Sequence, residues 1–449
     1  MSYINGKWRQ GLHLEPPHGW LNDPNGLCYF NGHYHVYFQY GPENANGNGQ
    51  KCWGHYQSAD LLDWEFTGTV FFPDIPEDKD GVYSGSAIVC GNALHIFYTG
   101  NVKEEGDHDY IYSGRGANVI HVVTTDGVTM GQKQVVLRNS DYPSFCSCHV
   151  RDPKVWKEND IWHMVLGART RSDKGCVLHY ISENLSDWIY KETLSASDFG
   201  YMWECPDMFT VDSHRFLSVS PQGLPHEETR YQNVYSSGYF QFDESLDNFS
   251  EWDFGFDFYA PQTFEAPDGR RILIGWMGIG DIPYKNPTEA LGYQHCLTLP
   301  REISLDHDGQ LCQKPFREFD NLRDEKEVYT SGQSWMQSLP FELTGEINGP
   351  FSISLDDVCE LSWDGHVAEL KFTNDTAGQG RDNRKAVLEN CRDIRIIADH
   401  SSLEIFLDGG KCVFSTRMYP AEDIISVRID GLDAAVYSLK SMKKNYIRE

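Results

Sequence analysis

Short runs in which apolar and polar residues alternate cover most of the chain, and turns rich in Gly, Asn and Asp separate these runs. Alternation with a period of two residues predicts β-strands that bury one face. The runs His33–Tyr40 and His95–Tyr98 are typical examples. Because convincing long amphipathic helices are absent from the pattern, it predicts an all-β protein.

One two-strand unit recurs five times in the first two thirds of the chain. Each copy opens with a polar motif, continues as an apolar strand, turns, and returns as a second strand. Successive copies are 52 to 68 residues apart, which is long enough for a four-stranded blade with its loops. Radial repetition of such sheets forms a β-propeller, so five copies predict five blades. The motifs are Asn22-Asp-Pro-Asn-Gly26, Tyr83-Ser-Gly-Ser86, Arg151-Asp-Pro153, Glu204-Cys-Pro-Asp207 and Tyr259-Ala-Pro-Gln262.

A propeller brings its repeats together at one place. If each motif opens the innermost strand of its blade, all five motifs meet at the same end of the central channel and line one funnel. Asp-Pro and Ser-Gly also favour turns wherever they occur, so a single copy of the motif could be a turn without any functional role. Five copies in phase, three of which carry a carboxylate, favour a functional site.

The repeat stops after Leu299–Leu305, and the charged stretch Arg317–Glu327 indicates a linker with a short helix. Further strand-like runs follow without the repeat, and their length over about 120 residues predicts a β-sandwich. We therefore predict a five-bladed β-propeller at residues 1–318, a linker at 319–328 and a C-terminal β-sandwich at 329–449. These runs are Phe351–Leu355, Glu369–Phe372, Ile394–Ile397, Ser402–Phe406, Cys412–Ser415 and Ile425–Ile429, with a hairpin turn at Gly409-Gly410.

Acidic residues outnumber basic ones, since 66 Asp and Glu against 38 Lys and Arg give a net charge of −28. Such a surface repels nucleic acid and anionic lipid, so neither is expected as a partner. No apolar run reaches the ~18 residues of a membrane span, and the first residues lack the apolar segment of a signal peptide. We expect a cytoplasmic protein that is a monomer or a homodimer.

The twelve cysteines extend from Cys28 to Cys412 in a chain large enough to fold without disulfide bonds. We predict thiols that are mostly buried and reduced. The alternative is that Cys146-Ser-Cys148-His149 forms half of a metal site, although no second ligand pair follows at zinc spacing.

Three motifs place an acidic side chain at the predicted funnel, namely Asp23, Asp152 and Glu204. Glycoside hydrolysis needs one carboxyl group that protonates the leaving oxygen and an ionised one that attacks or stabilises the sugar carbon. The sequence neighbours of Glu204, which are Trp203 and Cys205-Pro206, are apolar and predict a protonated acid. Asn22, Asn25 and Gly26 predict donors that keep Asp23 ionised as a nucleophile. A carboxylate separation of ~5–5.5 Å would mean retention and ~6.5–9.5 Å inversion, and the sequence leaves both open.

The same residues resemble glycoside hydrolase family 32, the invertases and β-fructosidases, and the resemblance covers essentially the whole chain. It implies a five-bladed propeller with an appended β-sandwich that hydrolyses terminal β-fructofuranosides with retention, without a metal or organic cofactor. The motifs are Trp20-Leu-Asn-Asp-Pro-Asn-Gly26, Phe38-Gln-Tyr40, Trp53-Gly-His55, Tyr83-Ser-Gly-Ser86, Arg151-Asp-Pro153, Tyr201-Met-Trp-Glu-Cys-Pro-Asp207, Tyr259-Ala-Pro-Gln262, Gly275-Trp-Met277, Leu299-Pro-Arg-Glu302, Ser401-Ser-Leu-Glu-Ile-Phe406 and Ser415-Thr-Arg-Met-Tyr-Pro420.

The resemblance also implies roles for single residues. Asp23 would be the nucleophile, Glu204 the acid and base, and Asp152 the residue that holds fructose hydroxyls and stabilises the transition state. The positions that would contact fructose are Asn22, Gln39, Trp53, Tyr83, Ser84, Arg151 and Trp276.

We expect hydrolysis of sucrose or short fructo-oligosaccharides, with sucrose 6-phosphate as an alternative substrate. A phosphate would require Arg or Lys at the mouth, and Lys51, Arg169, Arg171 and Lys174 lie in loops that could supply it. The charge of −28 favours a neutral fructoside. Two further hypotheses are an inverting propeller glycosidase, for example one that acts on arabinofuranosides, and a catalytically silent fructoside-binding propeller. The loop Gly41–Gly49 is expected to shape the leaving-group side.

Overall fold

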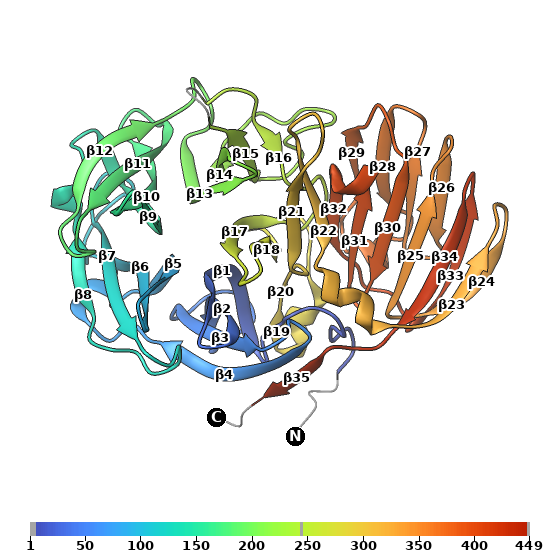
Figure 1. The fold of residues 1–449 in the computed structure, drawn as a ribbon, viewed down its shortest axis with the longest axis horizontal. Coiled ribbons are helices and arrows are strands. Elements are labelled where there is room, and N and C mark those ends of the chain that lie inside the picture. Colours follow the sequence, from blue (N-terminus) through green and yellow to red (C-terminus); the bar gives the residue numbers. More distant parts are fainter. Residues whose placement is uncertain (1–5, 243–245, 447–449) are drawn as a thin grey trace.

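The structure is a computed structural model that describes residues 6–242 and 246–446. Five sheets, each built on antiparallel neighbours along the chain, follow one another and surround a centre (Figure 1). Their first strands, β1, β5, β9, β13 and β17, contact one another in a closed ring. The predicted five-bladed propeller is therefore confirmed.

The blades are numbered I to V in chain order. Blade I contains β1 (Gly19–Phe30), β2 (His33–Gly41), β3 (Cys52–Ser58) and β4 (Asp63–Phe71); blade II β5 (Val82–Cys90), β6 (Ala93–Lys103), β7 (Arg115–Thr124) and β8 (Gln134–Leu137); blade III β9 (Cys146–Glu158), β10 (Ile161–Thr170), β11 (Gly175–Ser182) and β12 (Ile189–Leu194); blade IV β13 (Met202–Val211), β14 (His214–Gln222), β15 (Gly238–Gln241) and β16 (Ser250–Glu251); and blade V β17 (Tyr259–Glu265), β18 (Arg271–Met277), β20 (Cys296–Leu297), β21 (Arg301–Leu305) and β22 (Leu311–Pro315).

The recurring sequence motif is a β-bulge. In every blade the register between the first and second strands shifts where the motif lies, for example between Glu204 and Asp207 in blade IV. Three motif residues other than glycine adopt positive φ angles, namely Asp152 (64°), Cys205 (46°) and Ala260 (49°). Because a bulge re-aims the side chains around it, the same local irregularity turns polar groups of different blades toward one another.

Hydrogen bonds between motifs also hold the inner strands together. Neighbouring blades are joined by Gly85 N to Asn25 Oδ1 (3.0 Å), Ser86 Oγ to Pro153 O (2.8 Å), Cys205 N to Asp152 Oδ2 (3.0 Å) and Thr263 N to Asp207 Oδ2 (2.6 Å). The segments that carry the candidate site are therefore fixed by the architecture of the ring.

Two six-stranded sheets enclose a separate apolar core, as the predicted β-sandwich requires. One has the order β23 (Arg323–Tyr329), β34 (Asp433–Leu439), β25 (Phe341–Glu346), β30 (Asp393–Ala398), β31 (Ser402–Leu407) and β32 (Cys412–Arg417); the other has β24 (Ser334–Ser338), β33 (Ile424–Asp430), β26 (Phe351–Leu355), β27 (Cys359–Trp363), β28 (Val367–Phe372) and β29 (Asn383–Val387). The short helices are α1 (Asp375–Gly378) and the 3-10 helices η1 (Pro76–Asp78), η2 (Asn139–Asp141), η3 (Pro287–Leu291), η4 (Arg317–Leu322) and η5 (Asp408–Gly410), the last of which forms the expected hairpin turn.

The segment 319–328, which we predicted to be a linker, is more ordered than its sequence indicates. It begins in η4 and continues in β23, an edge strand paired with β34. All but the two end residues of β23 are exposed, so the strand lacks the apolar alternation that reveals buried strands. The chain also returns to the propeller at its end, because β35 (Lys443–Tyr446) pairs with β4, just as β19 (Tyr293–Gln294) pairs with β1.

Buried charges connect the two parts of the molecule. Arg301 of blade V pairs with Glu404 of the sandwich at 2.5 Å and with Asp253 at 3.2 Å. The ring nitrogens of His13 lie 2.8 Å from Asp399 and 2.9 Å from Glu404. Because breaking a buried pair leaves an uncompensated charge, this network opposes separation of the two parts.

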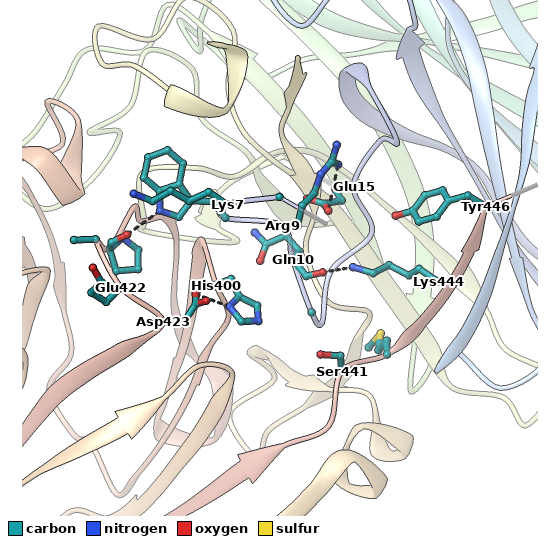
Figure 2. Close-up of a pocket in the computed structure, with 16 residues that line it drawn as sticks. Lys7, Arg9, Gln10, Glu15, His400, Glu422, Asp423, Ser441, Lys444 and Tyr446 are labelled. Carbon is teal, nitrogen blue, oxygen red and sulfur yellow. Dashed lines mark hydrogen bonds and ion pairs between the residues drawn. The ribbon is translucent and has the colours of Figure 1, made fainter. Parts of the chain in front are cut away.

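A cavity of about 640 Å³ lies where the N-terminal segment, the sandwich loop 420–423 and β35 meet (Figure 2). Figure 2 shows Lys444 donating to the carbonyl of Gln10, and His400 beside Asp423 at 3.0 Å. None of the three motif carboxylates lines this cavity, so it is separate from the candidate active site.

All twelve cysteines are free and ten of them are buried, as predicted. Within residues 6–242 and 246–446, no helix combines the length and the apolar character that crossing a membrane would demand.

Candidate active site

Three carboxylates from three blades converge at the mouth of the propeller. Asp23 lies on β1, Asp152 on β9 and Glu204 on β13. The thiol of Cys205 lies 3.7 Å from Oδ2 of Asp23 and 3.7 Å from Oδ2 of Asp152, so these oxygens are at most twice that distance apart. The structure thus gathers acidic residues separated by up to 181 positions in the sequence.

Asp23 is surrounded by polar side chains that hold its carboxylate in place. Ser84 Oγ donates to Oδ2 at 2.5 Å and Asn22 Nδ2 donates to Oδ1 at 3.1 Å. Gln39 joins these two donors, since it accepts from Asn22 at 2.9 Å and donates to Ser84 at 3.0 Å. Burial raises the pKa of Asp23, whereas the hydrogen bond from Ser84 lowers it and the charge of Glu204 raises it. Asn22, Gln39 and Ser84 therefore form one constellation with Asp23.

Two of the donors that we expected around Asp23, Asn25 and the backbone of Gly26, are not among the groups that donate to its carboxylate. Asn25 Nδ2 donates to the backbone carbonyl of Asp23 at 3.2 Å, and its Oδ1 accepts from Gly85. Neighbours along a bulged strand are poor guides to side-chain contacts, because the bulge changes the direction in which each side chain points.

Glu204 accepts hydrogen bonds on both carboxylate oxygens. Oε1 accepts hydrogen bonds from Nε and Nη2 of Arg151 at 3.0 and 2.5 Å. Oε2 accepts hydrogen bonds from Nε2 of Gln222 at 2.8 Å and from the hydroxyl of Tyr259 at 2.7 Å. The prediction of an apolar environment is therefore wrong. Side chains alternate along a strand, so Trp203 packs into the blade IV core, where its indole donates to the carbonyl of Phe199.

Asp152 is the most deeply buried of the three carboxylates, at 4% exposure. Its pKa is raised to about 7, chiefly by burial; the charge of Arg151 opposes this shift, and the charges of Glu204 and Asp23 contribute to it. Because the charge of Asp23 contributes to the shift of Asp152, these two carboxyl groups titrate as a coupled set and not one by one. Such a set can hold one group protonated while another is ionised, as acid and nucleophile roles require.

Replacing Ser84 by Ala removes the donor that lowers the pKa of Asp23. If ionised Asp23 is essential, activity is lost as the pH falls through the apparent pKa of the set. We expect the acidic limb of the kcat/KM profile to move to higher pH in this variant. Initial rates measured across pH would show the shift, and an unmoved limb would contradict the role of Ser84. Ser86→Ala is the control, because the Ser86 hydroxyl donates to the Pro153 carbonyl and not to Asp23.

The remaining predicted residues surround this centre. Trp53 is fully buried, and its indole donates to the backbone carbonyl of Tyr83 at 3.1 Å, so it fixes the strand that carries Tyr83 and Ser84. Trp276 lies edge-on to Trp20 at 6.0 Å and to Tyr259 at 6.4 Å between ring centroids. The Trp276 indole nitrogen is buried without a hydrogen-bond partner.

Several side chains of the site received no role from sequence reasoning. Tyr259 opens the fifth motif, and the signal for Gln222 is the hairpin register that pairs it with Met202. Cys205 was considered only as an apolar neighbour, yet its backbone N–H and its thiol both face Asp152. His149 accepts from Arg151 Nη1 at 2.6 Å, a contact that no sequence spacing indicates.

That contact also bears on the metal hypothesis for Cys146-Ser-Cys148-His149. In the described part of the chain, three potential ligand atoms come together only at Asp306, His307 and Asp308, in a largely exposed turn. The Cys146–His149 segment therefore does not form a three-ligand cluster.

The loop after β2 packs against the site. A Cβ on Gly47, whose φ is 78°, would lie 3.0 Å from the ring of Trp20, and Lys51 Nζ donates to the Gly47 carbonyl at 2.5 Å. Trp20 in turn donates to Asn22 at 2.9 Å. The loop is therefore connected to the Asp23 constellation through one aromatic ring.

Comparisons with known proteins agree with this geometry. Residues 13–315 match the family model "Glycosyl hydrolases family 32 N-terminal domain", and residues 360–441 match "Glycosyl hydrolases family 32 C terminal". A sucrose-6-phosphate hydrolase of Bacillus subtilis is 38% identical over 440 residues, which cover 92% of this chain and 89% of the relative. A raffinose invertase of Escherichia coli is 36% identical, with coverage of 93% and 90%.

Solved structures show the same similarity. A sucrose-6-phosphate hydrolase of Lactobacillus gasseri superposes with a TM-score of 0.88 at 26% identity, over 97% of this chain and 94% of that one. A β-fructofuranosidase of Bombyx mori superposes with a TM-score of 0.85 at 29% identity, over 99% and 96%.

Proposed function

The chain belongs to glycosyl hydrolase family 32, and from this premise we propose that its three converging carboxylates release fructose from β-fructofuranosides by double displacement. The observation that carries the proposal is the pair of distinct environments around Asp23 and Glu204. Asp23 is held by two neutral donors, whereas Glu204 faces a guanidinium, an amide and a phenol.

In the first step Asp23 attacks the anomeric carbon of fructose, and Glu204 gives its proton to the leaving oxygen. In the second step Glu204 takes a proton from water, which hydrolyses the fructosyl ester on Asp23 with overall retention. Arg151 and Tyr259 orient the Glu204 carboxyl group for both transfers. Asp152, which is fixed by a hydrogen bond from the Cys205 amide, accepts hydrogen bonds from fructose hydroxyls and stabilises the positive charge of the transition state.

The contacts to fructose are assigned to the residues that surround this set. Gln39 and Ser84 already hold one another and are within reach of the same sugar face as Asp23. Trp276 offers a buried indole N–H that has no protein acceptor. The full proposed set is Asn22, Gln39, Trp53, Tyr83, Ser84, Arg151 and Trp276, of which Trp53 acts through Tyr83.

The substrates that we propose are sucrose and short fructo-oligosaccharides, with sucrose 6-phosphate as the second candidate. The relatives favour the second candidate, since several are sucrose-6-phosphate hydrolases. We also propose a reducing, intracellular location, which the twelve free thiols support. We propose that the enzyme is a monomer or a homodimer and that its partner is a small sugar substrate.

Initial rates on sucrose, sucrose 6-phosphate, 1-kestose and inulin test this function. We expect release of fructose from at least one of the first three and slow release from the long polymer. A protein that binds these sugars without releasing fructose would instead be a silent fructoside-binding propeller, and the proposed activity would be wrong.

A further inference from the structure

Two loops meet beside Arg151 at the mouth between blades II and III. Residues 104–114 join β6 to β7, and residues 171–174 join β10 to β11. Both loops pack on the start of β9, where Cys148 N donates to Ile111 O at 2.7 Å and Arg171 N to Phe145 O at 2.8 Å. The hydroxyl of Tyr112 joins the loops by donating to Asp173 at 2.7 Å.

Three arginines act on His149 in this corner, namely Arg151, Arg115 and Arg169, although the loop 104–114 also carries four acidic residues. Arg151 bridges Glu204 and Nδ1 of His149, and the accepting imidazole is therefore neutral. Burial and the charges of Arg151, Arg115 and Arg169 together lower the pKa of His149 to about 3. Arg115 and Arg169 are thus near enough to His149 for their charges to act on it.

Arg115 is the residue of this group that lacks a counter-charge. It begins β7 and is half-buried; Nη1 donates to Asn101 at 3.3 Å, and Nε is buried without a hydrogen-bond partner. Among the arginines that the structure describes, only Arg115, Arg171 and Arg417 have no carboxylate within 4.0 Å. A partly desolvated charge without a partner is costly, and a bound anion would relieve that cost.

The position of Arg115 relates it to the leaving group. If Glu204 protonates the leaving oxygen, the leaving sugar lies on the side of Glu204 and Arg151, away from Asp23. Arg115 follows the 104–114 loop, which packs on Cys148 of β9, and the same strand carries Arg151, the partner of Glu204. Arg115 therefore lies at the blade II–III side of that pair. Its guanidinium offers a planar fork that matches two phosphate oxygens.

We propose that Arg115, assisted by Arg169, forms an anion subsite that binds the phosphate monoester of a phosphorylated leaving sugar. The subsite rests on the proposed function, because it assigns substrate class to the same active site. Arg169 contributes less, since its guanidinium already pairs with Asp173 at 2.8 Å and lies 4.8 Å from the ring of Tyr201. The net charge of −28 does not oppose this subsite, because salt screens the distant surface charges, whereas a direct contact between a guanidinium and a phosphate is shorter than the screening length.

Two other loop cations that the sequence offered for phosphate are otherwise engaged. Lys51 donates to Gly47, lies 5.3 Å from the Trp20 ring and acts electrostatically on Asp23, which is the fructose side. Lys174 pairs with Asp198 at 3.5 Å. The structure therefore favours the corner between blades II and III.

The test compares kcat/KM for sucrose 6-phosphate and sucrose in wild type, Arg115→Gln and Arg169→Gln. Arg215→Gln is the matched control, since it removes the same charge at the opposite end of blade IV, where Arg215 pairs with Glu158. We expect wild type to prefer the phosphorylated substrate by at least about tenfold, the scale of a charge-assisted contact. Arg115→Gln should lose most of this preference. In Arg169→Gln the ratio of the two kcat/KM values should fall about threefold, and in the control it should not change.

Calorimetry supplies an independent measurement with glucose 6-phosphate, glucose and inorganic phosphate as probes. Arg115→Gln should weaken binding of glucose 6-phosphate about tenfold without changing that of glucose; Arg115→Lys, which retains the charge, should recover part of the loss. Binding of inorganic phosphate alone at the same affinity would show a general anion site and contradict the sugar-phosphate assignment.

The outcomes separate the two proposals. If wild type hydrolyses neither of these substrates nor 1-kestose, the proposed function fails, and calorimetry still decides the subsite. If wild type hydrolyses both, but the preference is absent or changes less than twofold in Arg115→Gln, the anion subsite is overturned while the fructosidase stands.

Discussion

Asp23→Ala is expected to lower kcat on sucrose or its 6-phosphate on the order of 10⁴-fold or more, the scale on which loss of a nucleophile acts. Without the carboxylate no fructosyl ester can form. The fold should survive, because Asp23 is a half-buried carboxylate whose pKa is raised by desolvation, so its charge is not favoured in the folded chain. Initial rates together with a thermal unfolding midpoint measure both effects.

Asp160→Ala is the control for this substitution, since that side chain is almost fully exposed on the turn after β9. It should retain wild-type turnover. Near-normal activity of Asp23→Ala, or an equal loss in the control, would remove Asp23 from its proposed role.

Glu204→Ala is expected to lower kcat on the order of 10³-fold on substrates whose leaving group needs a proton. A fructosyl fluoride needs no such proton, so the first step should remain fast and the second should limit turnover. Added azide should then restore turnover and give a β-fructofuranosyl azide, because the small anion attacks without a general base.

Glu265→Ala, an exposed carboxylate on β17, should behave as wild type in the same assays. An equal loss on the fluoride and on sucrose, with no effect of azide, would mean that Glu204 acts on structure and not on proton transfer.

Much of the fold could be predicted because the strand pattern and the blade motif recur at regular intervals along the sequence. Motifs at Asp23, Ser84, Asp152, Glu204 and Ala260 recur at blade-length intervals, and a ring of blades is the architecture that such a repeat builds. The convergence of Asp23, Asp152 and Glu204 followed from the same argument, since the inner strands share one end of the channel. Periodicity could not reveal β23, whose side chains are nearly all exposed and charged, nor β35, which spans four residues.

The environments within the site were beyond sequence reasoning for a different reason. The partners of Glu204 come from three other strands, β9, β14 and β17, and none of them is its neighbour in sequence. The bulges that aim these side chains depend on pairing between strands, which alternation does not encode. Likewise, the unpaired state of Arg115 depends on the absence of a nearby carboxylate, which only the folded chain decides.

The central claim is that Asp23 forms a covalent fructosyl intermediate. The most direct measurement incubates the Glu204→Ala variant with β-fructofuranosyl fluoride, quenches with acid and maps the peptides by mass spectrometry. The proposed mechanism predicts one fructosyl ester, on the peptide that contains Asp23. An adduct on Asp152, or turnover of the fluoride without any adduct, would contradict it.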